Sequence, residues 1–244
     1  KPYKLKWIWL HVSFRYLDTD LKINSDDTLV IPEFYADLEQ LKKFNCKKIV
    51  FVQNAYYIFD GLKTVKNYED LKIKEAFYIL PHLKKILQQI TALPLYEMPP
   101  FIAPYFFSES SIERKKRIIL YPKFANREYD ILKRMLYDRL WLVQKSAVQK
   151  FFSAKTEWEL VELKDKQHHE VAKEMQQAAF FISLNTTEAF NSSVPEALAA
   201  GCINICYEGV GPADFLENNI NAFVFSNNHI FPLAEKIIKL VEQY

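Results

Sequence analysis

The sequence predicts an α/β fold made of two units, each built around a mainly parallel β-sheet. Short apolar segments alternate with amphipathic helical segments along the 244 residues, a pattern typical of strands joined by crossover helices. Residues 93–111 interrupt this alternation with several prolines and serines, and a new apolar strand follows them. We therefore expect two domains, residues 1–107 and residues 108–244, of which the first is short or truncated.

Seven segments fit short strands because they are apolar and bounded by polar or turn-forming residues. They are residues 28–31, 48–52, 76–80, 117–121, 157–163, 179–184 and 203–207. Six segments have helical periodicity, at residues 36–44, 83–90, 128–136, 168–178, 194–200 and 232–242. Because proline interrupts regular elements, residues 93–111 are expected to contain neither helix nor strand.

The composition is typical of a folded protein and does not indicate a polyanionic partner. Half of the residues are hydrophobic, and the formal net charge of +2 is too small to indicate nucleic acid. The lysines of the first half suit solvated helix faces, or a surface that meets anionic lipid. We find no signal peptide and no apolar stretch of the roughly 20 residues that a membrane helix needs. A cytoplasmic location is therefore expected, with peripheral contact at the inner face of the membrane left open.

The most informative part of the sequence is residues 180–201, where a buried strand is followed by a polar loop and a helix. In open α/β sheets, ligands bind just beyond the carboxyl ends of the strands, so this loop is placed for a ligand. Residues 191–193 precede Val194-Pro195-Glu196, which predicts a helix start with a Ser or Asn cap and Pro in the first turn. The N–H groups of such a helix start can hold a phosphate.

Glu188 and Glu196 are the two carboxylates of this segment. One falls on the loop and the other in the first helical turn, so both can border one pocket. Carboxylates accept hydrogen bonds from the vicinal hydroxyls of a ribose or a hexose. The alternative from spacing alone is that Glu196 only stabilises the positive helix N-terminus and that Glu188 is a solvated loop residue.

The motif Glu188-x7-Glu196, followed by Ala-Leu-Ala-Ala-Gly-Cys, resembles the donor-site signature of the family 4 retaining glycosyltransferases, which have the GT-B fold of two Rossmann-like units. The features downstream, a strand, a Gly-containing loop and an acidic helix start, are similar as well. This resemblance covers residues 113–244. Upstream, residues 29–33 and 49–57 look like the late acceptor-domain part of a rhamnosyltransferase-like branch.

The resemblance implies a role for each residue of the site. Glu196 would bind the donor ribose, and Glu188 would face the donor sugar. The donor diphosphate would be held by the backbone amides of Asn191, Ser192, Ser193 and Val194. Lys123 and Arg127 follow the first strand of the second domain, where the family has an Arg and a Lys, and would neutralise charge on the leaving diphosphate. An ordinary basic loop is the alternative for these two residues.

The implied function is transfer of a sugar from a nucleotide-diphosphate donor, of the UDP, GDP or dTDP type, to a glycan or lipid-linked acceptor in polysaccharide biosynthesis. Retention of configuration and independence of metal follow from the family, and no cofactor is expected. Only four glycines occur, and the Gly-rich loop that opens a full acceptor domain is absent. The alternative is a catalytically degenerate nucleotide-sugar-binding module that needs a partner.

On the acceptor side, Asn54, Tyr56 and Tyr57 follow a predicted strand at its carboxyl end. This position would let them meet an acceptor sugar across the cleft between the domains. Packing in the core is the competing role for the two tyrosines. His11 follows an apolar, Trp-rich segment and would line the same cleft, although a packed or surface histidine is the more common role for such a residue.

Two further motifs are considered as metal or catalytic sites and are not expected to be either. His168 and His169 stand at a predicted helix start between charged residues, where a solvated cap explains them better than metal binding or catalysis. Asp18-Thr-Asp20 matches the carboxylate pattern that binds Mg²⁺ or Mn²⁺ in the metal-dependent GT-A class. Such tripeptides are frequent by chance, so no metal site is expected.

Overall fold

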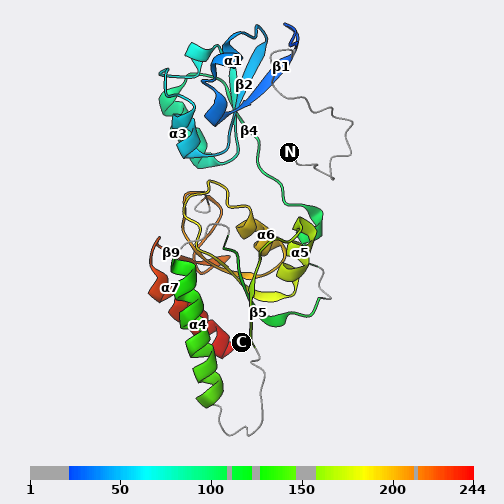
Figure 1. Cartoon of the computed structure of the whole chain (residues 1–244), viewed down its shortest axis with the longest axis vertical. Coiled ribbons are helices and arrows are strands. Elements are labelled where there is room, and N and C mark those ends of the chain that lie inside the picture. The colour runs from blue at the N-terminus through cyan, green and yellow to red at the C-terminus, as the bar shows by residue number, and fades with distance from the viewer. Residues whose placement is uncertain (1–21, 109–111, 123–126, 147–157, 212–213) are drawn as a thin grey trace.

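The described residues form two parallel β-sheets, one in each half of the chain (Figure 1). The computed structural model describes residues 22–108, 112–122, 127–146, 158–211 and 214–244. Helices pack on both sheets, so the α/β fold with two units that the sequence predicts is confirmed. Within these ranges, no helix is long and apolar enough to cross a lipid bilayer.

The first unit is a four-stranded parallel sheet with the strand order β1-β2-β3-β4. Its strands are β1 (Thr28–Pro32), β2 (Lys47–Val52), β3 (Glu75–Tyr78) and β4 (Leu95–Glu97). Its helices are α1 (Glu39–Lys42), α2 (Ala55–Asp60) and α3 (Pro81–Ile90), with the short 3-10 helices η1 (Glu33–Tyr35) and η2 (Glu69–Leu71). The main core lies between the sheet and helices α2 and α3, where Val50, Ile58 and Leu83 are fully buried.

The second unit is a five-stranded parallel sheet with the order β6-β5-β7-β8-β9. Its strands are β5 (Lys115–Leu120), β6 (Glu159–Glu162), β7 (Ala178–Ser183), β8 (Ile203–Tyr207) and β9 (Ala222–Phe225). Its helices are α4 (Arg127–Ser146), α5 (His168–Gln176), α6 (Ser193–Ala199) and α7 (Ile230–Gln243). Helices α4 and α7 cover one face, and α5 and α6 cover the other (Figure 1).

The strand order of the second sheet creates a topological switch point between β5 and β7. The chain passes from β5 to β6 on one side and then returns to β7 on the other side of β5. The connections that follow β5 and β7 therefore diverge and leave a crevice, which is where ligands bind in open α/β sheets. The loop after β7 contains Glu188, so the predicted donor loop lies at this crevice.

The prediction that residues 93–111 contain no regular element is wrong. Strand β4 and the 3-10 helix η3 (Pro104–Phe106) lie within them. The prolines border these elements instead of interrupting them, and the carbonyl of Pro94 accepts the Ala76 N–H at 3.0 Å beside β4. Pro104 occupies the first turn of η3, where a missing N–H is tolerated.

Helix α2 and strand β9 are also absent from the predicted elements. Helix α2 is rich in aromatic residues, which favour strands, but the Asn54 side chain caps it by accepting the Tyr56 N–H at 2.9 Å. Strand β9 is a short apolar run that is held by its pairing with β8. Helix α1 is shorter and α4 is longer than predicted, because helix ends depend on packing as well as on pattern.

Tyr129 joins the ends of two central strands to helix α4. Its buried hydroxyl donates to the Tyr121 carbonyl at 2.9 Å and accepts the Leu184 N–H at 3.0 Å. We expect Tyr129→Phe to lower the free energy of unfolding by about 1–3 kcal/mol, because it leaves a buried N–H without its partner. Urea denaturation measures this change. Tyr137→Phe, at an exposed position of the same helix, is the control, and an equal loss in both variants would contradict the assignment.

Candidate functional site

The two units meet at a cleft of about 710 Å³ at the carboxyl ends of their sheets. Six residues singled out from the sequence line it: Asn54, Tyr56 and Tyr57 from the first unit, and Glu188, Asn191 and Ser192 from the second. The rest of the first unit's wall is mostly apolar, with Phe51, Ile79, Met98, Pro99, Pro100 and Phe101. The fold thus brings these six residues, from both the predicted donor and the predicted acceptor side, to one cavity. Tyr56 and Tyr57 are exposed, which disfavours the alternative of core packing.

A buried hydrogen-bond network shapes the turn from β7 into α6. The Asn191 amide donates to the Ser183 hydroxyl at 2.9 Å, and the Ser193 hydroxyl donates to the Asn191 side-chain oxygen at 2.8 Å. Asn191 has a φ of 47°, a left-handed conformation that Asn tolerates better than most residues. Ser192 stands at the cap position, as the sequence predicts, and Pro195 lies in the first turn, but Ser192 has helical backbone angles and makes no side-chain capping bond. The Val194 N–H is bonded to the Asn191 carbonyl at 3.0 Å.

Glu188 is held by a turn that the sequence reasoning missed. The Asn185 amide donates to Glu188 Oε2 at 2.7 Å, and the Asn185 oxygen accepts the N–H groups of Thr187 at 3.0 Å and Glu188 at 3.2 Å. An Asn directly after a strand is a common start of such turns, so this signal was present in the sequence. The turn fixes the backbone from which the Glu188 side chain reaches the cleft.

Glu196 lies outside the lining of this cleft and contacts His168 instead. The Nε2 atom of His168 is 2.9 Å from Glu196 Oε1, and its Nδ1 atom is 2.6 Å from the Tyr105 hydroxyl. Burial, followed by the negative charge of Glu196, raises the pKa of Tyr105 above its usual value. The expectation that His168 is only a solvated cap is wrong, because the cap of α5 is made by its neighbours and the imidazole contacts Glu196. Sequence spacing could not find this pair, since its members are 28 residues apart.

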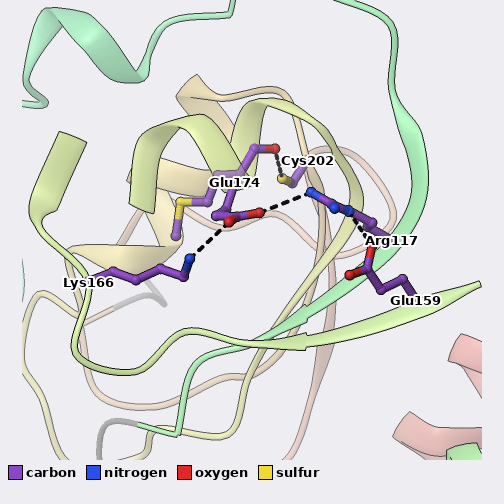
Figure 2. Close-up of polar contacts among 6 residues, drawn as sticks. Arg117, Glu159, Lys166, Glu174 and Cys202 are labelled. Carbon is purple, nitrogen blue, oxygen red and sulfur yellow. Dashed lines mark hydrogen bonds and ion pairs between the residues drawn. The ribbon is translucent and has the colours of Figure 1, made fainter. Parts of the chain in front are cut away.

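A network of charges fixes helix α5, whose first residue is His168 (Figure 2). Arg117 on β5 donates to Glu159 at 2.6 Å and to Glu174 at 3.0 Å, and Lys166 donates to Glu174 at 2.9 Å. The Cys202 thiol donates to a backbone carbonyl of the same helix at 3.0 Å. These contacts join β5, β6, α5 and the loop before α5, so the position of His168 is set by the framework of the second unit.

A buried carboxylate supports the wall that the first unit contributes to the cleft. Glu33 Oε1 accepts the N–H groups of Gln53 at 3.0 Å and Asn54 at 2.8 Å, and the side chain is fully buried. Its Oε2 atom and the Tyr68 hydroxyl are both buried without a hydrogen-bond partner among the described residues. Loss of hydration on burial raises the pKa of the Glu33 carboxyl above its usual value, although the backbone hydrogen bonds oppose the shift.

Polar contacts of Asn54 and of His82 link the two sheets' units. The Asn54 amide donates to the Thr187 carbonyl at 3.4 Å across the cleft. His82, in the first turn of α3, lies 2.6 Å from Asp214 through Nδ1, and its backbone N–H donates to the same carboxylate at 3.1 Å. Asp214 therefore neutralises the positive end of helix α3 from the other unit.

Among the remaining predicted residues, Arg127 is described and does not line the cleft. Arg127 is the first residue of α4 and is exposed. Lys123, His11 and the segment Asp18-Thr-Asp20 lie outside the described residues. In the part of the chain that the structure describes, no cluster of three or more His, Cys, Asp or Glu side chains is placed to hold a metal ion.

Two Rossmann-like units that meet at the carboxyl ends of parallel sheets, with the cleft between them, define the GT-B class of fold. Residues 153–244 match the family model described as glycosyl transferases group 1. The predicted resemblance to GT-B glycosyltransferases of this group is thereby confirmed. The rhamnosyltransferase-like branch stays a prediction.

Similar proteins include the alpha-1,6-glucosyltransferase of Actinobacillus pleuropneumoniae serotype 7 (strain AP76), which is 22% identical over 239 residues, covering 93% of this chain and 67% of the relative. The solved structure of TarM has a TM-score of 0.59 at 12% identity, covering 88% of this chain and 48% of TarM. The pneumococcal O-GlcNAc transferase GtfA, solved with UDP and GlcNAc, has a TM-score of 0.56 at 13% identity, covering 84% of this chain and 47% of GtfA. The chain thus spans about half the length of these two solved structures.

The buried Glu33 carboxyl should make stability depend on pH. Because its pKa is raised in the folded state, the folded chain binds the proton more tightly than the unfolded chain does. The resulting stabilisation of the folded state is fully present below the unfolded-state pKa of 4.5. It is lost as the pH rises through the folded-state pKa. Glu33→Gln keeps an oxygen for the Gln53 and Asn54 amides and cannot ionise.

We therefore expect Glu33→Gln to gain stability relative to the unmodified chain as the pH rises from about 5 to about 8. Thermal unfolding at both pH values measures the difference. Glu242→Gln, at an exposed position, is the control and should follow the unmodified chain. A pH dependence that is the same in Glu33→Gln as in the unmodified chain would refute the role of this carboxyl.

Proposed function

We propose that this chain belongs to a glycosyltransferase that moves a sugar from a nucleotide-diphosphate donor to a glycan or lipid-linked acceptor, with retention and without a metal ion. The observation behind the proposal is the cleft of about 710 Å³ that both units line. Its second-unit wall contains Glu188, Asn191 and Ser192, and its first-unit wall contains polar and aromatic groups suited to a sugar. UDP is the first donor nucleotide to test, since GtfA was solved with UDP and GlcNAc.

The donor would lie along the turn from β7 into α6. Glu188 would face the donor sugar, since its side chain lines the cleft and is oriented by Asn185. The amides of Asn191, Ser192 and Ser193 would meet the diphosphate at the helix start, whereas the Val194 N–H of the predicted set is already bonded to the Asn191 carbonyl. Glu196 would bind the ribose through its carboxylate, which is bonded to the ring of His168.

The acceptor would approach from the wall of the first unit. Asn54 offers an amide at the cleft, and Tyr56 and Tyr57 offer aromatic surface on which the apolar face of a sugar can pack. Lys123 and Arg127 would neutralise the charge that develops on the leaving diphosphate, the electrostatic contribution that is often the largest in catalysis. In a retaining reaction of this kind, departure of the leaving group would be stabilised without a covalent bond to the protein.

The donor site is tested by adding UDP, GDP, dTDP and their sugars and following thermal unfolding. A ligand at 100 times its Kd adds about 2.7 kcal/mol to the stability of the folded state. We expect stabilisation by one nucleotide diphosphate and loss of most of it in Glu196→Ala. Glu242→Ala, with an exposed carboxylate at the end of α7, is the control and should bind as the unmodified chain does. Stabilisation by none of the nucleotides would favour a degenerate module that needs a partner.

Glu188→Gln separates binding from chemistry. The amide retains the size of the side chain and one acceptor oxygen but loses the negative charge beside the donor sugar. We expect turnover of the donor, measured by release of nucleotide diphosphate, to fall by about 10²-fold or more while the Kd changes by less than about 3-fold. Equal losses in both quantities would instead assign Glu188 to ground-state binding.

A further inference from the structure

The imidazole of His168 contacts groups from two other segments and does not cap its own helix. The cap of α5 is formed by Gln167, whose N–H donates to Glu170 at 2.8 Å. His168 instead spans from the Tyr105 hydroxyl to Glu196 Oε1, at 2.6 and 2.9 Å. The structure therefore leaves this ring with no part in starting the helix and with two polar partners from elsewhere in the chain.

One arrangement of protons satisfies both contacts of a neutral His168. With its proton on Nε2, the ring donates to Glu196 and accepts the Tyr105 O–H on Nδ1. The opposite tautomer would put a lone pair of the ring against a carboxylate oxygen, which also has no proton to donate. The contacts thus select the tautomer that donates to the carboxylate.

The surroundings hold the ring in place. The Phe106 ring, which is fully buried, packs edge-on against the imidazole with 4.8 Å between ring centres. The ion pairs of Figure 2 fix the helix that His168 begins, and Lys166 fixes the loop before it. The imidazole side chain is 55% exposed, whereas the Glu196 side chain is 10% exposed. The nearly buried carboxylate is therefore bonded to a well-anchored ring at the surface.

We propose that His168 is a positioning residue that orients the Glu196 carboxylate toward the ribose of the donor nucleotide. This inference rests on the proposed ribose role of Glu196. A carboxylate has about four acceptor positions, and a bond from the imidazole occupies one of them and fixes the rotation of the group. A carboxylate that is already oriented loses less conformational entropy when the ribose hydroxyls bind. Tyr105 contributes indirectly: its hydroxyl donates to His168 Nδ1 and so favours the tautomer with its proton on Nε2.

The experiment measures the Kd of UDP, GDP and dTDP by calorimetry on the whole chain. We expect His168→Ala to raise the Kd of the preferred nucleotide about 10-fold, the effect of losing one hydrogen bond to a charged group. His168→Gln should recover most of the affinity, because its amide can donate to Glu196. His169→Ala, which removes the exposed neighbouring ring, should leave the Kd unchanged.

A double-mutant cycle separates positioning from a general structural effect. If His168 acts through Glu196, His168→Ala should change the Kd by less than about 2-fold when Glu196 is already replaced by Gln. Tyr105→Phe, which keeps the aromatic ring, should weaken binding less than His168→Ala does. An unchanged Kd in His168→Ala, or the same loss in the Glu196→Gln background, overturns the positioning role while the donor site stands. Binding of none of the three nucleotides overturns the proposed function and this role together.

Nitrogen NMR of the ligand-free chain provides a second readout that needs no nucleotide. We expect the His168 ring to carry a proton on Nε2, and its Nδ1 signal to change in Tyr105→Phe. A neutral ring with its proton on Nδ1 alone would leave nothing to donate to Glu196 and would overturn the inference even if the protein binds nucleotides.

Discussion

The turn from β7 into α6 is the constraint on which the second unit's wall of the cleft depends. Asn191 adopts a left-handed conformation there, and its side chain is bonded at both ends, to Ser183 at the end of the strand and to Ser193 at the start of the helix. These groups are buried, so each bond lost would leave an unsatisfied polar atom in the protein interior. By fixing the angle between strand and helix, this network sends Glu188 and Ser192 to the cleft and Glu196 toward α5.

Gly211 also constrains the loop after β7, because its backbone packs closely against that of Ala189. A Cβ atom at this position would lie 0.9 Å from the carbonyl oxygen of Ala189, so no other residue fits there without moving the loop after β7. The first unit has a counterpart at Gly61, where a Cβ atom would lie 1.7 Å from the backbone oxygen of Glu33. In both walls of the cleft, a close approach between two backbone segments therefore supports the loop that would meet substrate.

The strands could be predicted from the sequence, whereas most of the hydrogen bonds between polar side chains could not. A buried strand such as β7 must be apolar along its whole length, so its pattern is visible in a single segment. The burial of Glu33 and the pairing of His168 with Glu196 depend on segments that meet only after folding. Helix α2 was missed for a different reason: its aromatic residues favour a strand, whereas the Asn54 side chain caps a helix. The motif around Glu188 and Glu196 could be recognised, but their different surroundings could not be predicted.

Those different surroundings suit two different tasks for the two carboxylates. Glu188 lines an open cleft and accepts a hydrogen bond from the Asn185 amide; in the proposed reaction its carboxylate would face a sugar that becomes positive as the leaving group departs. Glu196 is nearly buried and contacts an imidazole, which suits a group that must accept hydrogen bonds from hydroxyls in a fixed geometry. In the proposed reaction, the rigidly held Glu196 would contribute to donor binding, and Glu188, facing the reacting centre, would contribute to the rate. The fold makes this division possible because Glu188 lies on the loop after β7, at the cleft, whereas Glu196 lies in the first turn of α6, against His168.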